Sequence, residues 1–288
     1  MTKKLPAWFK QQIPDAEVKG RIKLLGELNV NTVCSHAGCP NLSFCFKNLK
    51  FTFLILGDTC TRNCRFCGVG KSKGKKLTLD ENEPNRVSQA VKMLNLKFAV
   101  ITSVTRDDLA DKGAAHFSRT IRMIRQKDKS TEVEALIPDF SGDITGLKCV
   151  IDSEPSILAH NLETVRRLYG DLRPEADYDS SLRILKEAKE INPSLITKSS
   201  LILGMGEAED EVIYAMEDLR SSGCDILTLG QYLAPTEKHH PVAEFVEEEQ
   251  FDEYRRLGLG FGFKEVLSGP KVRSSYQAEK VFQGLKNV

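Results

Sequence analysis

From Phe51 onward, short apolar stretches of strand character alternate with amphipathic stretches of helical character, and this alternation constrains the fold most. Six stretches predict strands: Phe51–Leu56, Phe98–Val104, Val133–Ile137, Ile157–His160, Ile196–Leu203 and Ile226–Leu229. Stretches between them predict helices: Asn85–Leu96, Ala114–Gln126, Asp179–Ile191 and Glu209–Ser222. Pro84 is expected at the first position of one helix and Asp179 at the N-cap of another.

Strands that alternate with helices predict an α/β fold of parallel βα units joined by right-handed crossovers. A complete eightfold barrel needs ~250 residues, so six units predict an open, partial (βα)6 barrel of TIM type. We expect this barrel over residues 51–246, after a cysteine-rich N-terminal extension over residues 1–50. Trp8 is expected to anchor that extension on the barrel. A C-terminal tail, residues 247–288, predicts a helix and a short strand at Phe263–Leu267 and is expected to close over the barrel mouth.

The overall charge offers no broad attraction to polyanions. The chain has 41 basic and 40 acidic residues, a formal net charge of +1, so we expect neither nucleic acid nor a membrane surface as a partner. The longest apolar runs are far below the ~20 residues of a membrane span. The N-terminal residues lack the apolar core of a secretory signal, which predicts a cytoplasmic protein.

The cysteines are distributed unevenly along the chain. Six of the eight fall between Cys34 and Cys67, whereas Cys149 and Cys224 stand alone and are expected to be core thiols. Clustered cysteines in a cytoplasmic chain indicate metal or redox chemistry rather than disulfides.

One cysteine triad, Cys60, Cys64 and Cys67, has the spacing C-x3-C-x2-C and directly follows the first predicted strand of the barrel. It therefore lies at the carboxyl end of that strand, where barrel enzymes place their chemistry. Three thiolates can hold three irons of a four-iron cluster and leave the fourth iron open to another ligand. Zinc is the alternative, although its structural sites use four closed ligands.

A second triad, Cys34, Cys39 and Cys45, has the spacing C-x4-C-x5-C. A structural zinc site that also uses His36 is the alternative reading of this triad. Two neighbouring three-cysteine sets are hard to explain by packing, and together they predict two metal centres.

Polar residues at the ends of other strands are candidate cofactor contacts. Asn161 and Glu163 follow the fourth strand, and Lys198 is a candidate partner for a carboxylate. The segment after the second strand carries further charged residues, which either bind a cofactor or form a solvated loop: Arg106, Asp107, Asp108 and Asp111. A basic stretch beside the first triad either docks an acidic partner or is simply solvated: Arg62, Arg65, Lys71, Lys73, Lys75 and Lys76.

The string CTRNCRFC resembles the C-x3-C-x-aromatic-C motif of the radical S-adenosylmethionine (SAM) enzymes, with Phe66 in the aromatic position. The resemblance implies a 4Fe–4S cluster on Cys60, Cys64 and Cys67. It also implies that SAM chelates the open iron and is cleaved to a 5′-deoxyadenosyl radical. Phe66, Asn161, Glu163 and Lys198 are the candidate residues for SAM binding.

The pairing of both triads resembles lipoyl synthases, as do CPNLSFCF, ITSVTRDDLADKGAAHF, HNLETV, RPEADYDSSL and GPKVRSSY. This resemblance covers nearly the whole chain. It implies a second, auxiliary 4Fe–4S cluster on Cys34, Cys39 and Cys45, with Ser275 of the RSSY string as its fourth ligand. Arg273 of the same string is a candidate substrate-binding residue.

The family resemblance implies a reaction in which two sulfur atoms enter C6 and C8 of a protein-bound octanoyl-lysine. The auxiliary cluster supplies the sulfur, and two SAM molecules supply the radicals. The implied partners are octanoylated carrier domains, namely the glycine-cleavage H protein and 2-oxo-acid dehydrogenase E2 subunits, together with an electron donor of flavodoxin or ferredoxin type. The alternatives are another two-cluster, sulfur-inserting radical enzyme and a non-catalytic iron–sulfur or zinc module.

Overall fold

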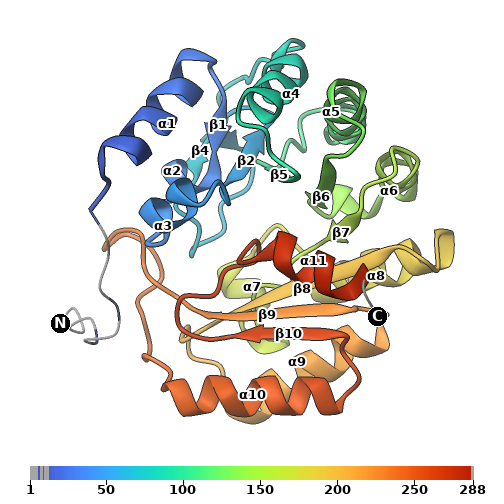
Figure 1. Cartoon of the computed structure of the whole chain (residues 1–288). Helices are drawn as coiled ribbons and strands as arrows, with labels where there is room; N and C mark the ends of the chain where they lie inside the picture. The colour runs from blue at the N-terminus through green and yellow to red at the C-terminus, as the bar shows by residue number, and fades with distance from the viewer. Residues whose placement is uncertain (1–5, 7–8, 10–12, 287–288) are drawn as a thin grey trace.

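A computed structural model describes residues 6, 9 and 13–286 of the chain. Its centre is one eight-stranded sheet in the order β1-β2-β5-β6-β7-β8-β9-β10 (Figure 1). The strands are β1 Asn31–Thr32, β2 Thr52–Ile55, β5 Phe98–Ser103, β6 Glu132–Leu136, β7 Ile157–Ala159, β8 Ile196–Leu203, β9 Ile226–Gln231 and β10 Glu265–Ser268. All neighbours pair in parallel except β1 and β2, which are antiparallel.

Helices connect the parallel strands along one face of the sheet. They are α4 Glu83–Met93, α5 Ala114–Lys127, α6 Ile144–Ile151, α7 Tyr169–Leu172, α8 Tyr178–Ile191, α9 Glu209–Ser221 and α10 Glu248–Gly260. The extension adds α1 Ala16–Glu27, α2 Val33–His36 and α3 Leu42–Lys47, and the chain ends in α11 Ala278–Lys286. No helix within the described residues is both long and apolar enough to cross a bilayer.

The six predicted strands are present, which confirms an α/β partial barrel. The strand expected in the tail is β10, which pairs in parallel with β9 and extends the sheet by one strand. Asp179 is not the N-cap of α8. Asp177 caps that helix by accepting a hydrogen bond from the Ser180 backbone N–H at 2.7 Å, and Asp179 pairs with Arg166 instead. Pro84 is the second residue of α4 rather than the first. Trp8 lies outside the described residues.

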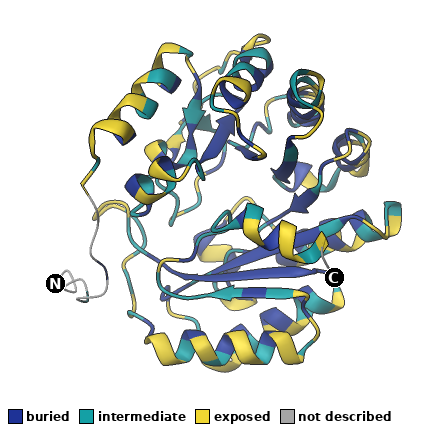
Figure 2. Ribbon diagram, in the orientation of Figure 1, coloured by how far each residue is buried: buried dark blue, intermediate teal, exposed yellow. Residues whose placement is uncertain are grey.

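The two faces of the sheet are covered differently. Side chains that alternate along the central strands, such as Ile101 and Ala135, join the apolar cluster that includes α4, α5 and α6. The other set on the same strands faces the concave interior, where Phe98, Val100 and Ile157 pack against α11. In Figure 1, α11 lies on the opposite side of β8–β10 from α9 and α10. Figure 2 shows the consequence, with buried strands under helices exposed on their outer faces.

The N-terminal extension packs directly onto the barrel. Val18 and Leu25 of α1 and Phe46 of α3 belong to the same apolar cluster as Phe53 of β2. Arg21 of α1 donates hydrogen bonds to the carbonyls at the end of α3, at 2.5 and 2.6 Å. The second cysteine triad is thereby held against the first strands of the sheet.

We predict that α11 is required to close the interior of the barrel. The Phe282 ring is buried 5.5 Å from the Phe98 ring, so Phe282→Ala leaves a cavity and should lower the free energy of unfolding by about 3 kcal/mol. Tyr214→Ala, at an exposed aromatic residue of α9, should change it by less than about 0.5 kcal/mol. Urea unfolding followed by circular dichroism compares the two. Equal losses would show that α11 is a dispensable appendage.

Candidate active site

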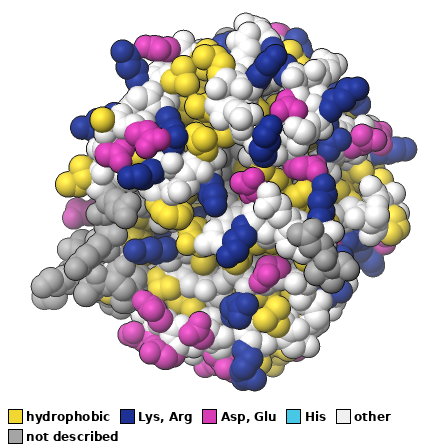
Figure 3. Space-filling model, in the orientation of Figure 1, with side chains coloured by type: hydrophobic (Ala, Val, Ile, Leu, Met, Phe, Trp, Pro, Cys, Tyr) yellow, Lys and Arg dark blue, Asp and Glu magenta, His cyan; other side chains and the backbone are white. Residues whose placement is uncertain are grey.

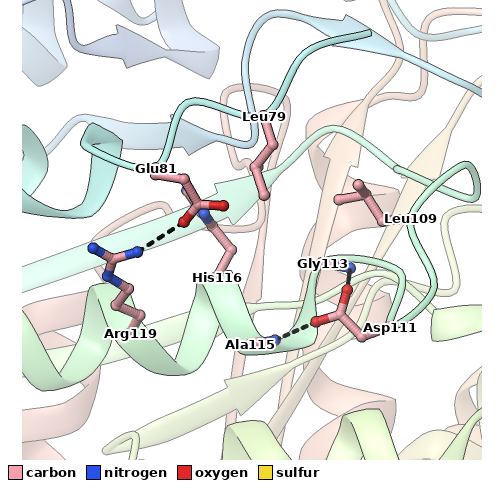
Figure 4. Close-up of a pocket in the computed structure, with 8 residues that line it drawn as sticks. All are labelled: Leu79, Glu81, Leu109, Asp111, Gly113, Ala115, His116 and Arg119. Carbon is pink, nitrogen blue, oxygen red and sulfur yellow. Dashed lines mark hydrogen bonds and ion pairs between the residues drawn. The ribbon is translucent and has the colours of Figure 1, made fainter. Parts of the chain in front are cut away.

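A buried carboxylate holds the start of the loop that carries the first triad. Glu83 of α4 accepts hydrogen bonds from the backbone N–H of Leu56 at 2.6 Å and of Gly57 at 3.2 Å, where the chain leaves β2 with positive φ. His116 of α5 lies 2.8 Å from the same carboxylate. A small pocket beside His116 has a volume of about 140 Å³. Figure 4 shows the residues that line it, among which Glu81 pairs with Arg119. None of the cysteines lines this pocket.

The first triad lies on the loop after β2, as expected. Cys60 accepts two backbone N–H groups, from Arg62 at 3.4 Å and Thr105 at 3.3 Å. Burial, opposed by Arg173 and reinforced by the thiols of Cys67 and Cys60, raises the pKa of Cys64 to about 11. The three thiols therefore lie close enough for their charges to interact. This donor set fits the three protein ligands of a four-iron cluster.

Arg62 is part of the internal structure of this loop rather than of an exposed basic surface. It is buried and donates to Asp107 at 2.8 and 3.0 Å and to Asp139 at 2.5 and 2.6 Å. Burial alone would raise the pKa of Asp139, but Arg62 outweighs it and holds the pKa at about 2. Arg65 pairs with Asp171, whereas the lysines of the basic stretch have no ion pair with any residue that the structure describes.

The carboxylates after β5 have partners within the protein. Asp107 binds Arg62, Asp108 binds Arg106 through two hydrogen bonds of 2.8 Å, and Asp111 caps α5. Arg106 is almost fully buried. These charges shape the loop, and the geometry favours a structural role for them over the cofactor contacts that the sequence left open.

Asn161 and Glu163 lie beside the first triad. The Glu163 carboxylate accepts a hydrogen bond from the Asn161 amide at 3.0 Å and raises the pKa of Cys67, which locates it near that thiol. Glu163 has φ of 72°, a left-handed conformation that is unfavourable for a side chain of this size and typical of functional sites. Burial raises its pKa, and Arg173 opposes that rise.

Arg173 is a site residue that the sequence analysis missed. Its guanidinium donates to the carbonyls of Asn161 and Leu162 at 3.2 and 3.1 Å and lies 4.9 Å above the Tyr169 ring. Its Nε is buried without a hydrogen-bond partner among the described residues, and its charge lowers the pKa of Cys64. It stands at the start of the RPEADYDSSL string, which was the only sequence signal for it.

Lys198 is less available than expected. Its ammonium lies 2.9 Å from both oxygens of Glu134, and both side chains are fully buried. Burial raises the pKa of Glu134, and Lys198 opposes that rise. The structure therefore favours Arg173 over Lys198 as the cation that faces the first triad. Phe66 packs in a small apolar cluster with Leu172 and Tyr232.

The thiols of the second triad also lie close enough to influence one another's pKa. Cys34 is buried, and the neighbouring thiols of Cys39 and Cys45 add to the rise in its pKa that burial causes. Burial also raises the pKa of Cys45, to about 12. The described residues contain no three His, Cys, Asp or Glu side chains that converge as a single metal ion requires. His36 Nδ1 donates a hydrogen bond to the Thr32 carbonyl, 2.9 Å away.

The C-terminal RSSY segment bonds residues that lie beside each triad. The Thr52 hydroxyl donates to the Ser275 hydroxyl at 2.7 Å, and the Thr52 backbone forms a hydrogen bond to Cys34, so Ser275 is one residue removed from the second triad. Arg273 is close to Cys39 and Cys45, whose charges oppose the lowering of its pKa by burial. This donor set, three thiols with a neighbouring hydroxyl, fits a second four-iron cluster.

Comparisons with known proteins agree with this geometry. A family model described as the radical SAM superfamily matches residues 54–219. A lipoyl synthase of Caldicellulosiruptor saccharolyticus is 48% identical over 97% of this chain and 98% of its own length. A lipoyl synthase of Thermus thermophilus is 48% identical over 96% of this chain and 86% of its own. The chain belongs to the lipoyl synthase family of radical SAM enzymes.

Solved structures show the same fold at much lower identity. Methylornithine synthase covers 82% of this chain and 81% of its own length, with a TM-score of 0.54 and 14% identity. SuiB of Streptococcus suis, bound to its precursor peptide, covers 87% of this chain and 52% of its own length, with a TM-score of 0.60 and 10% identity. Membership of the lipoyl synthase family makes this chain a sulfur-inserting enzyme that uses SAM and an iron–sulfur cluster.

We predict that Glu83 sets the position of the loop that carries the first triad. Glu83→Gln replaces one acceptor oxygen by an NH2 group that faces existing donors, so it should cost about 2 kcal/mol of unfolding free energy and weaken iron retention. Glu81→Gln, at the exposed neighbouring pair, should cost less than about 0.5 kcal/mol. Urea unfolding and iron analysis after gel filtration test both. Equal losses of unfolding free energy and of iron in Glu83→Gln and Glu81→Gln would contradict the role of Glu83.

A second prediction concerns pH. His160 is buried with Nδ1 2.9 Å from the Ile137 carbonyl, and burial, reinforced by Arg173, lowers its pKa to about 4. The unfolded chain takes up this proton near pH 6.5, whereas the folded chain resists until about pH 4. Stability from the neutral imidazole is therefore complete above pH 6.5 and lost as the pH falls toward 4, by about 3 kcal/mol.

His160→Asn keeps a donor for the Ile137 carbonyl and should flatten this part of the stability profile, measured by urea unfolding of the metal-free chain from pH 7 to 4. His239→Asn, at a histidine that is not buried, should keep the wild-type slope. A wild-type slope in His160→Asn would show that another group titrates.

Proposed function

We propose that this chain inserts sulfur at C6 and C8 of an octanoyl group that is amide-linked to a lysine of a lipoyl carrier domain. One 4Fe–4S cluster would be held by Cys60, Cys64 and Cys67, and an auxiliary one by Cys34, Cys39, Cys45 and Ser275. The observation that supports the proposal is the pair of hydrogen bonds made by Thr52. Its hydroxyl donates to Ser275, more than 200 residues away in sequence, and its backbone bonds Cys34 of the second triad. When bound, SAM and the first cluster supply the power to abstract hydrogen from an unactivated methylene, and the auxiliary cluster supplies sulfur.

The residues around the first triad would bind and orient SAM. Arg173 is the candidate for its carboxylate, because the guanidinium is buried, carries an unpartnered Nε and lies near Cys64. Asn161 and Glu163 would present a partly buried amide and carboxylate to other polar groups of the same ligand. Phe66 adds to an apolar wall with Tyr232 that excludes water from this side. Lys198 would contribute only if its pair with Glu134 opened.

Arg273 would serve the auxiliary site more directly than the substrate. Its guanidinium lies close enough to Cys39 and Cys45 to counter their negative charge. From that position it would contact an acyl chain that passed between the two triads. We retain it as a substrate-binding candidate on this basis.

The partners follow from the proposed substrate. Glycine-cleavage H protein and 2-oxo-acid dehydrogenase E2 subunits carry such lysines, and a flavodoxin or ferredoxin would supply electrons in the cytoplasm. Lys73, Lys75 and Lys76 are exposed after the first triad and are candidates for docking an acidic carrier. Figure 3 shows basic and acidic side chains interspersed over the visible face, so any such attraction is local.

The test is to remove the second triad alone. After anaerobic reconstitution, wild type should contain about eight irons per chain, and Cys34→Ala/Cys39→Ala/Cys45→Ala about four. The triple variant should still cleave SAM reductively and form no sulfur-inserted product, because only the auxiliary site is lost.

A matched control is Cys149→Ala, which removes a partly buried cysteine of α6 outside both triads and should keep about eight irons. About four irons in wild type and triple variant alike would overturn the two-cluster proposal. The chain would then hold only one cluster, and its sulfur would have to come from elsewhere.

A further inference from the structure

The segment that carries both serines is held at several points. The Asn41 amide donates to the Lys271 carbonyl at 2.6 Å, which ties the segment to the loop of the second triad. The next carbonyl, of Val272, lies against Gly230 of β9, where an added Cβ would be 2.0 Å from the oxygen. Downstream, α11 is packed inside the barrel. The chain on both sides of the RSSY residues is therefore fixed to the barrel, whereas the RSSY turn itself depends on the contacts of its own side chains.

Two consecutive serines of this segment point to different triads. The Ser274 hydroxyl donates to the Asn161 Oδ1 at 2.9 Å, and Asn161 in turn donates to Glu163 at 3.0 Å, beside Cys67. Ser275 accepts from Thr52, next to Cys34. The Tyr276 N–H bonds the Arg273 carbonyl at 2.8 Å, which closes a tight turn around both serines.

The hydrogen bond from Ser274 also orients the Asn161 amide. With Oδ1 facing Ser274, Nδ2 faces the Glu163 carboxylate as a donor. Without the Ser274 hydroxyl, nothing among these contacts fixes Oδ1, and an inverted amide would place its oxygen against the Glu163 oxygen. The state of the C-terminal segment therefore decides how two candidate SAM-binding residues are presented.

We propose that Ser274 is a positioning residue that couples SAM binding to the occupation of the auxiliary site. Ligation of Ser275 orders the turn, which holds Ser274 on Asn161 and so presents Asn161 and Glu163 to SAM. The coupling is reciprocal, so bound SAM also stabilises the auxiliary site. The inference rests on the proposed function, because it takes Ser275 as the auxiliary ligand and Asn161 as a SAM contact.

The experiment compares SAM affinity with and without the auxiliary site. Equilibrium dialysis measures the Kd for SAM of the reconstituted full chain and of Cys34→Ala/Cys39→Ala/Cys45→Ala. Each is measured with Ser274, with Ser274→Ala and with the conservative Ser274→Thr. With Ser274, loss of the auxiliary site should weaken SAM binding about fivefold, which corresponds to one hydrogen bond. With Ser274→Ala this difference should vanish, and Ser274→Thr should restore it.

A second measurement, amide hydrogen exchange, does not require a bound iron–sulfur cluster. In the metal-free chain, Ser274→Ala should speed hydrogen exchange of the amides at 273–276, whereas Ser194→Ala, at an exposed serine, should not. Two results overturn the coupling even if wild type holds two clusters. Either loss of the auxiliary site changes the Kd for SAM equally with Ser274 and with Ser274→Ala, or it does not change the Kd in wild type. Wild type with only about four irons overturns the proposed function, and the coupling with it.

Discussion

The buried ion pairs of Arg62 with Asp107 and Asp139 fix the loop that carries the first cysteine triad. Arg62 comes from the loop after β2, Asp107 from the loop after β5 and Asp139 from the loop after β6. A buried charge is tolerated only when it is paired, so these three loops have to meet at one edge of the sheet. The loop with Cys60, Cys64 and Cys67 is thereby fixed over the carboxyl ends of the parallel strands.

The N-terminal extension and the C-terminal tail complete the site that the Arg62 ion pairs hold in place. The N-terminal extension brings the second triad against β2 through the core contacts of Phe46, and the tail brings Ser274 to Asn161 and Ser275 to Thr52. The close approach at Gly230 and the packing of α11 inside the barrel hold the tail in this position. The proposed division at residues 50 and 246 therefore describes order along the chain better than three independent units.

Several features of the site were within reach of the sequence, and others were not. The spacing of the cysteines located both triads, because each triad is local in sequence, and a predicted strand directly before Cys60 placed the first one at the end of that strand. Arg173 was missed because its importance depends on contacts with Asn161 and Tyr169 that only folding creates. Lys198 and Arg62 were read as available cations, and the fold pairs each with a buried carboxylate from a distant strand or loop.

The sequence by itself determined the alternation of strands and helices, the two cysteine triads and the family, since all of these depend on local patterns. The tertiary structure decided which charged side chains are paired inside the protein, which residues Ser274 and Ser275 bond, and that α11 packs inside the barrel. The physical reason is that a side chain's partner depends on long-range packing. Thr52 and Ser275, or Asn161 and Ser274, meet only after the sheet has curved and the tail has crossed it.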